Sequence, residues 1–146
     1  MIHINTFTCI YDELEDRIRL SINYQDPLNR IDFMITRRFV LKLFPVLEEN
    51  YYKFFGMPQN HDEIQKANSN TKTDGATFQL IMDKSELLHK VDLKFDEKIK
   101  RLTLIFYGKN DTASALLDGD SYKYFLKILQ TSVPSYSWGI HKLIDL

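Results

Sequence analysis

Arg37 and Arg38 are the residues whose type and position point most directly to chemistry. They come at the predicted start of a helix, where a cation opposes the helix dipole at a cost of roughly a few tenths of a kcal/mol. A guanidinium can bind a carboxylate or a phosphate through paired hydrogen bonds. Carboxylates lie nearby in the acidic run 12–16, in which the candidate partners are Asp12, Glu13, Glu15 and Asp16. We expect a salt bridge within the chain or between subunits, with a small anionic ligand or substrate as the alternative.

A dense aromatic run follows near the end of the same predicted helix. It consists of Tyr51 and Tyr52, then Lys53, then Phe54 and Phe55. Two or three of these rings must face the core. If the others remain exposed, they form an apolar patch of the kind that marks a partner surface. Tyr51, Tyr52, Phe54 and Phe55 are therefore partner-surface candidates, and core packing is the alternative.

A third group of residues could bind single-stranded nucleic acid. Cations flanking aromatic side chains on a strand form stacking platforms for bases. The candidates here are Lys94, Lys98, Lys100, Arg101 and Lys109, with Phe106 and Tyr107 beside them. Carboxylates interleave with these cations and weaken the field, so we rank nucleic acid below a protein partner.

No catalytic, cofactor or metal motif stands out in the sequence. The four histidines are scattered, the spacings typical of zinc sites are absent, and the single Cys9 excludes an intramolecular disulfide. The glycines match neither phosphate-binding loops nor a nucleophile elbow. We therefore predict no catalytic residue, no cofactor and no metal, and we favour a non-enzymatic protein, with an enzyme as the alternative.

Composition favours an ordinary soluble domain. The chain has 146 residues, a formal net charge of −1 and 27% charged residues. A near-neutral balance argues against a dedicated DNA coat or a polybasic membrane anchor. No signal peptide or membrane span is visible, so we expect one domain, 1–146, in the cytoplasm.

The elements that must position these residues can be predicted from periodicity. Residues 1–11 alternate as one strand with both faces partly covered. A hairpin follows, in which the apolar face carries Ile18, Leu20, Ile22 and Tyr24 and the opposite face carries Arg17, Arg19, Ser21 and Asn23. Thr36 is the predicted cap of a helix to about residue 51, with a kink or early stop at Pro45.

The second half of the chain shows the same kinds of element. Strands are predicted near 77–81, 87–96, 99–107 and 112–117, and a helix from Ser121 to about Ser132, capped by Asp118 or Asp120. Between the halves, residues 57–76 are an internal polar linker. We predict an α+β fold with a mostly antiparallel sheet and two helices on one face.

The two halves could be repeats of one strand–turn–strand–helix unit. An offset of about 84 residues aligns equivalent positions: Ile18/Leu102, Leu20/Leu104, Ile22/Phe106, Ile35/Leu117, Thr36/Asp118 and Phe39/Tyr122. Alternation and capping alone would also give this similarity, so duplication is one of two explanations.

Residues 12–50 also show a resemblance. The strand Glu15-Asp16-Arg17 and the helix entry Phe33-Met34-Ile35-Thr36-Arg37-Arg38-Phe39-Val40 resemble a family of small bacterial proteins of unknown function, with Phe33 where others often carry Trp. The resemblance implies a bacterial protein with paired hairpin-and-helix units, and it implies no activity.

These observations lead to three functional hypotheses. The first is a non-enzymatic protein–protein interaction or adaptor protein, in the form of a homodimer or with another protein as partner. The second is a single-stranded nucleic-acid-binding protein that uses the face from Lys94 to Lys109. The third is a protein or enzyme that holds a small anionic ligand with Arg37 and Arg38. We expect no membrane partner.

Overall fold

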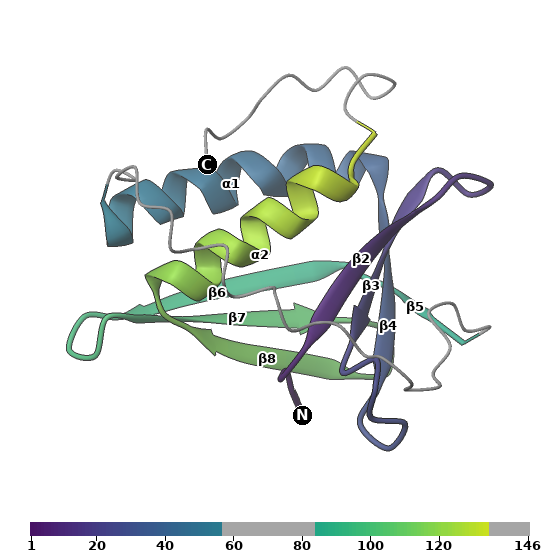
Figure 1. Ribbon diagram of the computed structural model, residues 1–146, viewed down its shortest axis with the longest axis horizontal. Coiled ribbons are helices and arrows are strands. Elements are labelled where there is room, and N and C mark those ends of the chain that lie inside the picture. The colour runs from purple at the N-terminus through teal and green to yellow at the C-terminus, as the bar shows by residue number, and fades with distance from the viewer. Residues whose placement is uncertain (57–83, 135–146) are drawn as a thin grey trace.

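The computed structural model describes residues 1–56 and 84–134, which form eight strands and two helices (Figure 1). In chain order these are β1 (Ile2–His3), β2 (Phe7–Asp12), β3 (Arg17–Ile22), β4 (Ile31–Thr36), α1 (Arg37–Phe55), β5 (Glu86–Leu87), β6 (Lys90–Asp96), β7 (Arg101–Tyr107), β8 (Thr112–Leu117) and α2 (Gly119–Ser132).

The strands form two four-stranded sheets. The N-terminal sheet has the order β2-β3-β4-β5 and the C-terminal sheet the order β1-β8-β7-β6. Each contains three antiparallel strands and one short parallel strand contributed by the other half of the chain. The predicted α+β class and mostly antiparallel pairing are confirmed, with the strands divided between two sheets. Figure 1 shows both helices on one side of β6, β7 and β8, and β2, β3 and β4 running steeply across those strands.

The N-terminal segment differs from its prediction as one strand. It makes a crossing, in which β1 pairs with β8 and β2 pairs with β3. The break falls at Asn5 and Thr6, whose backbone N–H groups both donate to the Asn23 side chain, at 2.8 and 3.2 Å. Those two amides bond to a side chain, and the chain changes sheet at this point.

Both helices begin at the predicted caps. The Thr36 hydroxyl accepts from Phe39 N at 3.2 Å, and the Asp118 carboxylate accepts from Ser121 N at 2.8 Å. The early stop predicted at Pro45 is wrong, because α1 continues through it to Phe55. Pro45 is exposed, so water can satisfy the carbonyl that its missing N–H leaves without a helical bond.

The pairing registers match in the two halves, as the predicted strand–turn–strand–helix units require, and duplication as their origin stays a prediction. Ile18 pairs with Ile35 in the N-terminal sheet, and Leu102 pairs with Leu117 at the equivalent place in the C-terminal sheet. Each half therefore consists of a short strand, three antiparallel strands and a helix. The caps shift the helical alignment by one residue, so that Val40, and not Phe39, corresponds to Tyr122; both are fully buried.

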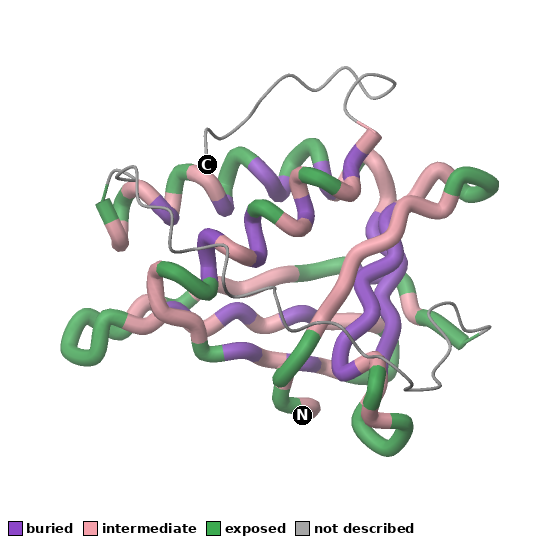
Figure 2. The backbone as a smooth tube through the Cα atoms, in the orientation of Figure 1, coloured by how far each residue is buried: buried purple, intermediate pink, exposed green. Residues whose placement is uncertain are grey.

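A single hydrophobic cluster includes residues from both halves. Figure 2 shows buried segments along β3 and β4 and on the inner turns of α1 and α2. The predicted inward residues Ile18, Leu20 and Ile22 are all buried. The predicted linker 57–76, the strand at 77–81 and the C-terminal tail lie outside the described residues. No helix in the described part of the chain is long and apolar enough to cross a membrane.

Candidate functional site

The structure brings Arg37 and Asp16 together. Arg37 Nη2 lies 3.0 Å from Asp16 Oδ2, and both side chains are about two-fifths exposed, at 42% and 43%. The Tyr11 hydroxyl donates to the other Asp16 oxygen at 2.6 Å. Arg38 is exposed one residue further along α1. A half-exposed ion pair contributes little to stability, about 0–1 kcal/mol.

The four aromatic candidates at the end of α1 pack against other elements. The Phe54 and Phe95 rings stack with their centroids 4.3 Å apart, and the Tyr51 and Phe55 rings lie 6.1 and 5.8 Å from that of Tyr122. Tyr51 is buried, and Tyr52, Phe54 and Phe55 are partly buried. Such contacts join α1 to β6 and α2, which is the arrangement expected of core packing.

The face proposed for nucleic acid carries charges of both signs. Lys94, Arg101 and Tyr107 lie on the outer face of the C-terminal sheet, whereas Phe106 points into the core and is 3% exposed. The Tyr107 hydroxyl donates to Asp92 at 2.9 Å. This bond is the main reason why the pKa of Tyr107 is raised above its usual value. The one available ring is therefore bonded to a carboxylate.

The remaining predicted cations are divided between two turns. Lys98 and Lys100 lie in the β6–β7 turn, and Lys109 lies in the β7–β8 turn at the opposite end of β7. They do not form one continuous basic stripe, which is the usual footprint of nucleic-acid binding.

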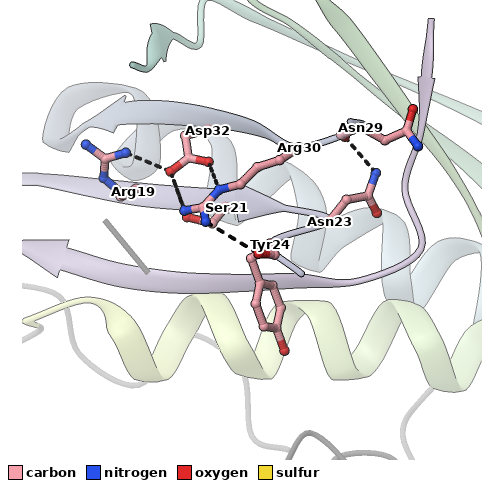
Figure 3. Close-up of polar contacts among 7 residues, drawn as sticks. All are labelled: Arg19, Ser21, Asn23, Tyr24, Asn29, Arg30 and Asp32. Carbon is pink, nitrogen blue, oxygen red and sulfur yellow. Dashed lines mark hydrogen bonds and ion pairs between the residues drawn. The ribbon is translucent and has the colours of Figure 1, made fainter. Parts of the chain in front are cut away.

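A buried ionic cluster, which sequence patterns did not predict, lies on the face of the N-terminal sheet opposite to Ile18, Leu20 and Ile22. Figure 3 shows Asp32 between Arg19 and Arg30. Arg19 Nη1 lies 2.7 Å from Asp32 Oδ2, Arg30 Nε lies 2.8 Å from Oδ1, and the Ser21 hydroxyl donates to Oδ2 at 3.0 Å. The side chains of Arg19, Arg30 and Asp32 are 8%, 5% and 1% exposed. Arg19, Ser21 and Asn23, predicted to share the polar face of this strand, are thus all buried.

A hydrogen bond links this cluster to the backbone at Tyr24, two residues after the end of β3. Arg30 Nη1 donates to the backbone carbonyl of Tyr24 at 3.4 Å. In Figure 3 the Tyr24 ring points away from the charged groups and toward α2. A buried cluster of this kind is strongly specified in geometry, because every charged group needs its partner. Through the Arg30 bond, the cluster holds the backbone of Tyr24 in place.

Asn23 organises the same corner from the other side. It is 2% exposed and has a left-handed backbone, with φ at 54°. Its side-chain oxygen accepts from the backbone N–H groups of Asn5 and Thr6, and its amide nitrogen donates to the carbonyls of His3 and Asn29 at 3.0 and 3.1 Å. One side chain therefore holds the crossing from β1 to β2 in place.

An apolar cleft of about 360 Å³ opens beside this corner, between the two sheets and α2. The N-terminal sheet contributes Phe7, Leu20 and Ile22, the C-terminal sheet contributes Leu104, Phe106, Ala115 and Leu117, and α2 contributes Ser121, Tyr124 and Phe125. Ile4, Asn5, Thr6, Tyr24 and Gln25 complete the lining, and Asn5, Thr6, Gln25 and Ser121 are exposed at the surface. The volume lies within the range of small-ligand sites.

Among the described residues, no charged side chain lines the cleft. Its hydrogen-bonding groups are hydroxyls and amides, and burial is the main reason why the pKa of Tyr124 is raised. A site of this composition can bind a neutral apolar group, whereas binding a bare charge there would carry a desolvation cost with no compensating partner. Proton transfer near neutral pH would need a group that the lining does not provide.

Other chemistry is also limited in the described residues. They contain no group of three or more His, Cys, Asp or Glu that could hold a metal ion. Burial raises the pKa of the Cys9 thiol to about 12, and a hydrogen bond with Ser132 opposes part of this rise. A thiol in that state is a poor nucleophile.

Three comparisons with known proteins gave no assignment. No protein-family model, no curated protein and no solved structure matches the chain. The resemblance of residues 12–50 to small bacterial proteins therefore stays a prediction.

Proposed function

We propose that this chain is a non-enzymatic protein-interaction protein, and that the cleft between its sheets receives an apolar side chain of the partner. The observation that carries the proposal is a cleft of about 360 Å³ whose described lining residues are all uncharged. Binding surfaces concentrate apolar and aromatic contacts at the centre and polar groups at the rim. The cleft has this order, with Phe7 and Phe125 inside and Gln25 and Ser121 at its mouth.

The composition of the cleft favours binding over catalysis. Catalytic sites need acids and bases whose pKa values lie near the working pH. The described lining residues include no histidine, carboxylate, lysine or arginine, and burial raises the pKa of the Tyr124 hydroxyl above its usual value. Ser121 has no histidine or carboxylate beside it in the lining that could activate its hydroxyl.

The other two hypotheses have less support in the geometry. A nucleic-acid role would rely on Lys94 and Arg101, next to Asp92 and a Tyr107 hydroxyl that this carboxylate binds. An anionic ligand at Arg37 would have to compete with Asp16 at 3.0 Å. The proposal sets the protein in a bacterial cytoplasm, with which the single cysteine is compatible.

Affinity capture from the host tests the proposal, with each extract divided into nuclease-treated and untreated halves. A lysine introduced by Tyr124→Lys puts a charge at the cleft, and Leu41→Lys puts the same charge on an exposed position of α1. We expect a stoichiometric protein partner that survives nuclease with the native chain and Leu41→Lys and is lost with Tyr124→Lys. Equal capture by both variants, or partners lost on nuclease treatment, would contradict the proposal.

Sedimentation equilibrium of the purified chain distinguishes a second copy from another protein. If the partner is the chain itself, the native protein and Leu41→Lys should be dimers and Tyr124→Lys a monomer. A monomer in all three cases points to a different protein as the partner.

A further inference from the structure

A comparison of equivalent positions in the two halves of the chain explains why the cleft is present. Leu20 pairs with Phe33 in the N-terminal sheet, and its equivalent Leu104 pairs with Ala115 in the C-terminal sheet. Phe33 and Ala115 therefore occupy the same place in the two halves. One half has an aromatic ring at this place, and the other half has a methyl group that lines the cleft.

In the first half the ring is enclosed. Phe33 is 0% exposed, and its ring centroid lies 6.3 Å from that of Phe106. Gly108 leaves room for it, because a Cβ there would come within 2.6 Å of Phe33 Cε1. The position equivalent to Gly108 in the other half is Tyr24, whose partly exposed ring stands at the cleft. The arrangement of large and small residues is thus reversed, and within the described part of the chain the interior next to Ala115 is left open.

We infer, resting on the proposed interaction function, that the occupant of the cleft is an aromatic side chain of the partner, in the place that Phe33 takes in the other half. The surroundings suit a ring. The ring centroid of Phe7 lies 5.3 Å from that of Phe125, in an edge-on arrangement, and 5.9 Å from that of Tyr124. Aromatic pairs at such distances prefer edge-to-face or offset contacts and gain about 0.5–1.5 kcal/mol beyond the area they bury.

The lining also selects against other side chains. A charged side chain would find no counter-charge among the described lining residues, which are all neutral. An aliphatic side chain could enter, but it would not gain the ring–ring contacts. The exposed amides and hydroxyls of Asn5, Thr6, Gln25 and Ser121 can bond to the backbone on either side of the inserted ring.

An NMR titration of the full chain with three probes tests the inference. The probes are N-acetyl-phenylalaninamide, N-acetyl-leucinamide and N-acetyl-lysinamide. We expect amide shifts at Ala115 and Tyr124, and about 10-fold tighter binding of the phenylalanine probe than of the leucine probe, from the combined gain of the ring contacts. Equal binding of the phenylalanine and leucine probes, or no binding of any probe, would overturn the inference.

A ring added within the chain provides the matched variant. Ala115→Phe should fill the cleft and abolish binding of the phenylalanine probe. Leu116→Phe adds a ring to the next residue of β8, which is 52% exposed on the other face, and should bind like the native chain. Unchanged binding by a folded Ala115→Phe variant would overturn the inference. If that variant does not fold, the smaller Ala115→Leu and the probe preference of the native chain decide the result.

The two proposals can fail separately. A captured protein partner together with no aromatic preference would retain the interaction function and remove the aromatic occupant. A clear aromatic preference with no captured partner and no dimer would retain the site and remove the interaction function.

Discussion

Phe33 of β4 and Ala115 of β8 occupy equivalent positions in the two sheets. The Phe33 ring is fully buried, whereas the Ala115 methyl group lines an open cleft. Removal of the Phe33 ring should show how much it contributes to the free energy of unfolding. We expect Phe33→Ala to lower the free energy of unfolding by about 3–5 kcal/mol, the usual cost of a cavity left by a deleted aromatic side chain. Urea unfolding measures this loss. Leu116→Ala, at a half-exposed position of β8, is the control and should change stability by less than about 1 kcal/mol.

The Asp32 cluster should behave as a buried network. Asp32→Asn leaves Arg19 and Arg30 without their carboxylate, and removal of one partner from a buried ion pair costs about 3–5 kcal/mol. Asp96→Asn, at an exposed end of β6, should cost less than about 0.5 kcal/mol. Unfolding curves of the two variants make the comparison. Similar losses of unfolding free energy in Asp32→Asn and Asp96→Asn would contradict the prediction that Asp32, Arg19 and Arg30 stabilise one another.

Asn23 should be needed for its side chain as well as for its backbone. Asn23→Gly keeps the left-handed conformation and removes the four partly buried side-chain bonds, and we expect a loss of more than about 2 kcal/mol because each such bond contributes about 0.5–1.5 kcal/mol. Asn23→Ala should lose about 1 kcal/mol more, since alanine is strained at positive φ.

Hydrogen exchange locates the effect of the Asn23 variants. The Ile4 amide donates to the Ser114 carbonyl at 2.8 Å, and it should exchange faster in both variants as β1 detaches. Lys100→Gly is the control, because Lys100 also has a φ of 54° but is exposed. Native protection of Ile4 in the Asn23 variants would show that another contact holds the crossing.

Glu86 and Asp111 should titrate as a pair. Desolvation raises the pKa of Glu86, but hydrogen bonds from the backbone N–H groups of Asn110 and Asp111, at 2.8 and 3.1 Å, outweigh it and lower the pKa. The pKa of Asp111 is raised, mainly by its hydrogen bond with Glu86 and then by desolvation and the Glu86 charge. Between the usual and the raised pKa, the folded state keeps a proton on Asp111 that the unfolded state releases, so the contribution of Asp111 to stability falls as pH rises through this range.

The variant Glu86→Gln separates the two groups. It retains an oxygen for both backbone bonds and removes the negative charge, so the pKa of Asp111 should fall toward its usual value. Carboxyl ¹³C shifts followed against pH measure the change. An Asp111 midpoint that stays raised would show that Glu86 is not the cause.

Much of the fold follows from local sequence rules. The alternation at Ile18, Leu20 and Ile22 and the caps at Thr36 and Asp118 are local features, and each predicts its element correctly. The division of residues 1–11 between two sheets is not local, since it depends on the Asn23 side chain from a distant turn. Burial of Arg19 with Asp32 also escapes prediction, because alternation identifies the two faces of a strand but not whether both are covered.

The candidate cleft is harder to predict than the elements that line it. Each lining residue has an ordinary reason to be where it is, and the cavity arises from the combination of Ala115 with residues of the other sheet and α2. One signal was present in the sequence. The register that aligns Ile35 with Leu117 also aligns Phe33 with Ala115, and a difference in size at a core position of a repeat indicates either a compensating residue or a void.

The exchange of short strands between the halves has a consequence for synthesis. Ile2 pairs with Ala113, so β1, the first of the described strands to be synthesised, finds its partner only after β2 to β7 and the start of β8 have been made. The three antiparallel strands β2, β3 and β4 can pair early, because their contacts are close in sequence. The growing chain therefore carries β1 without its partner until β8 is made, and closure of the corner that holds the cleft is a late event in its biogenesis.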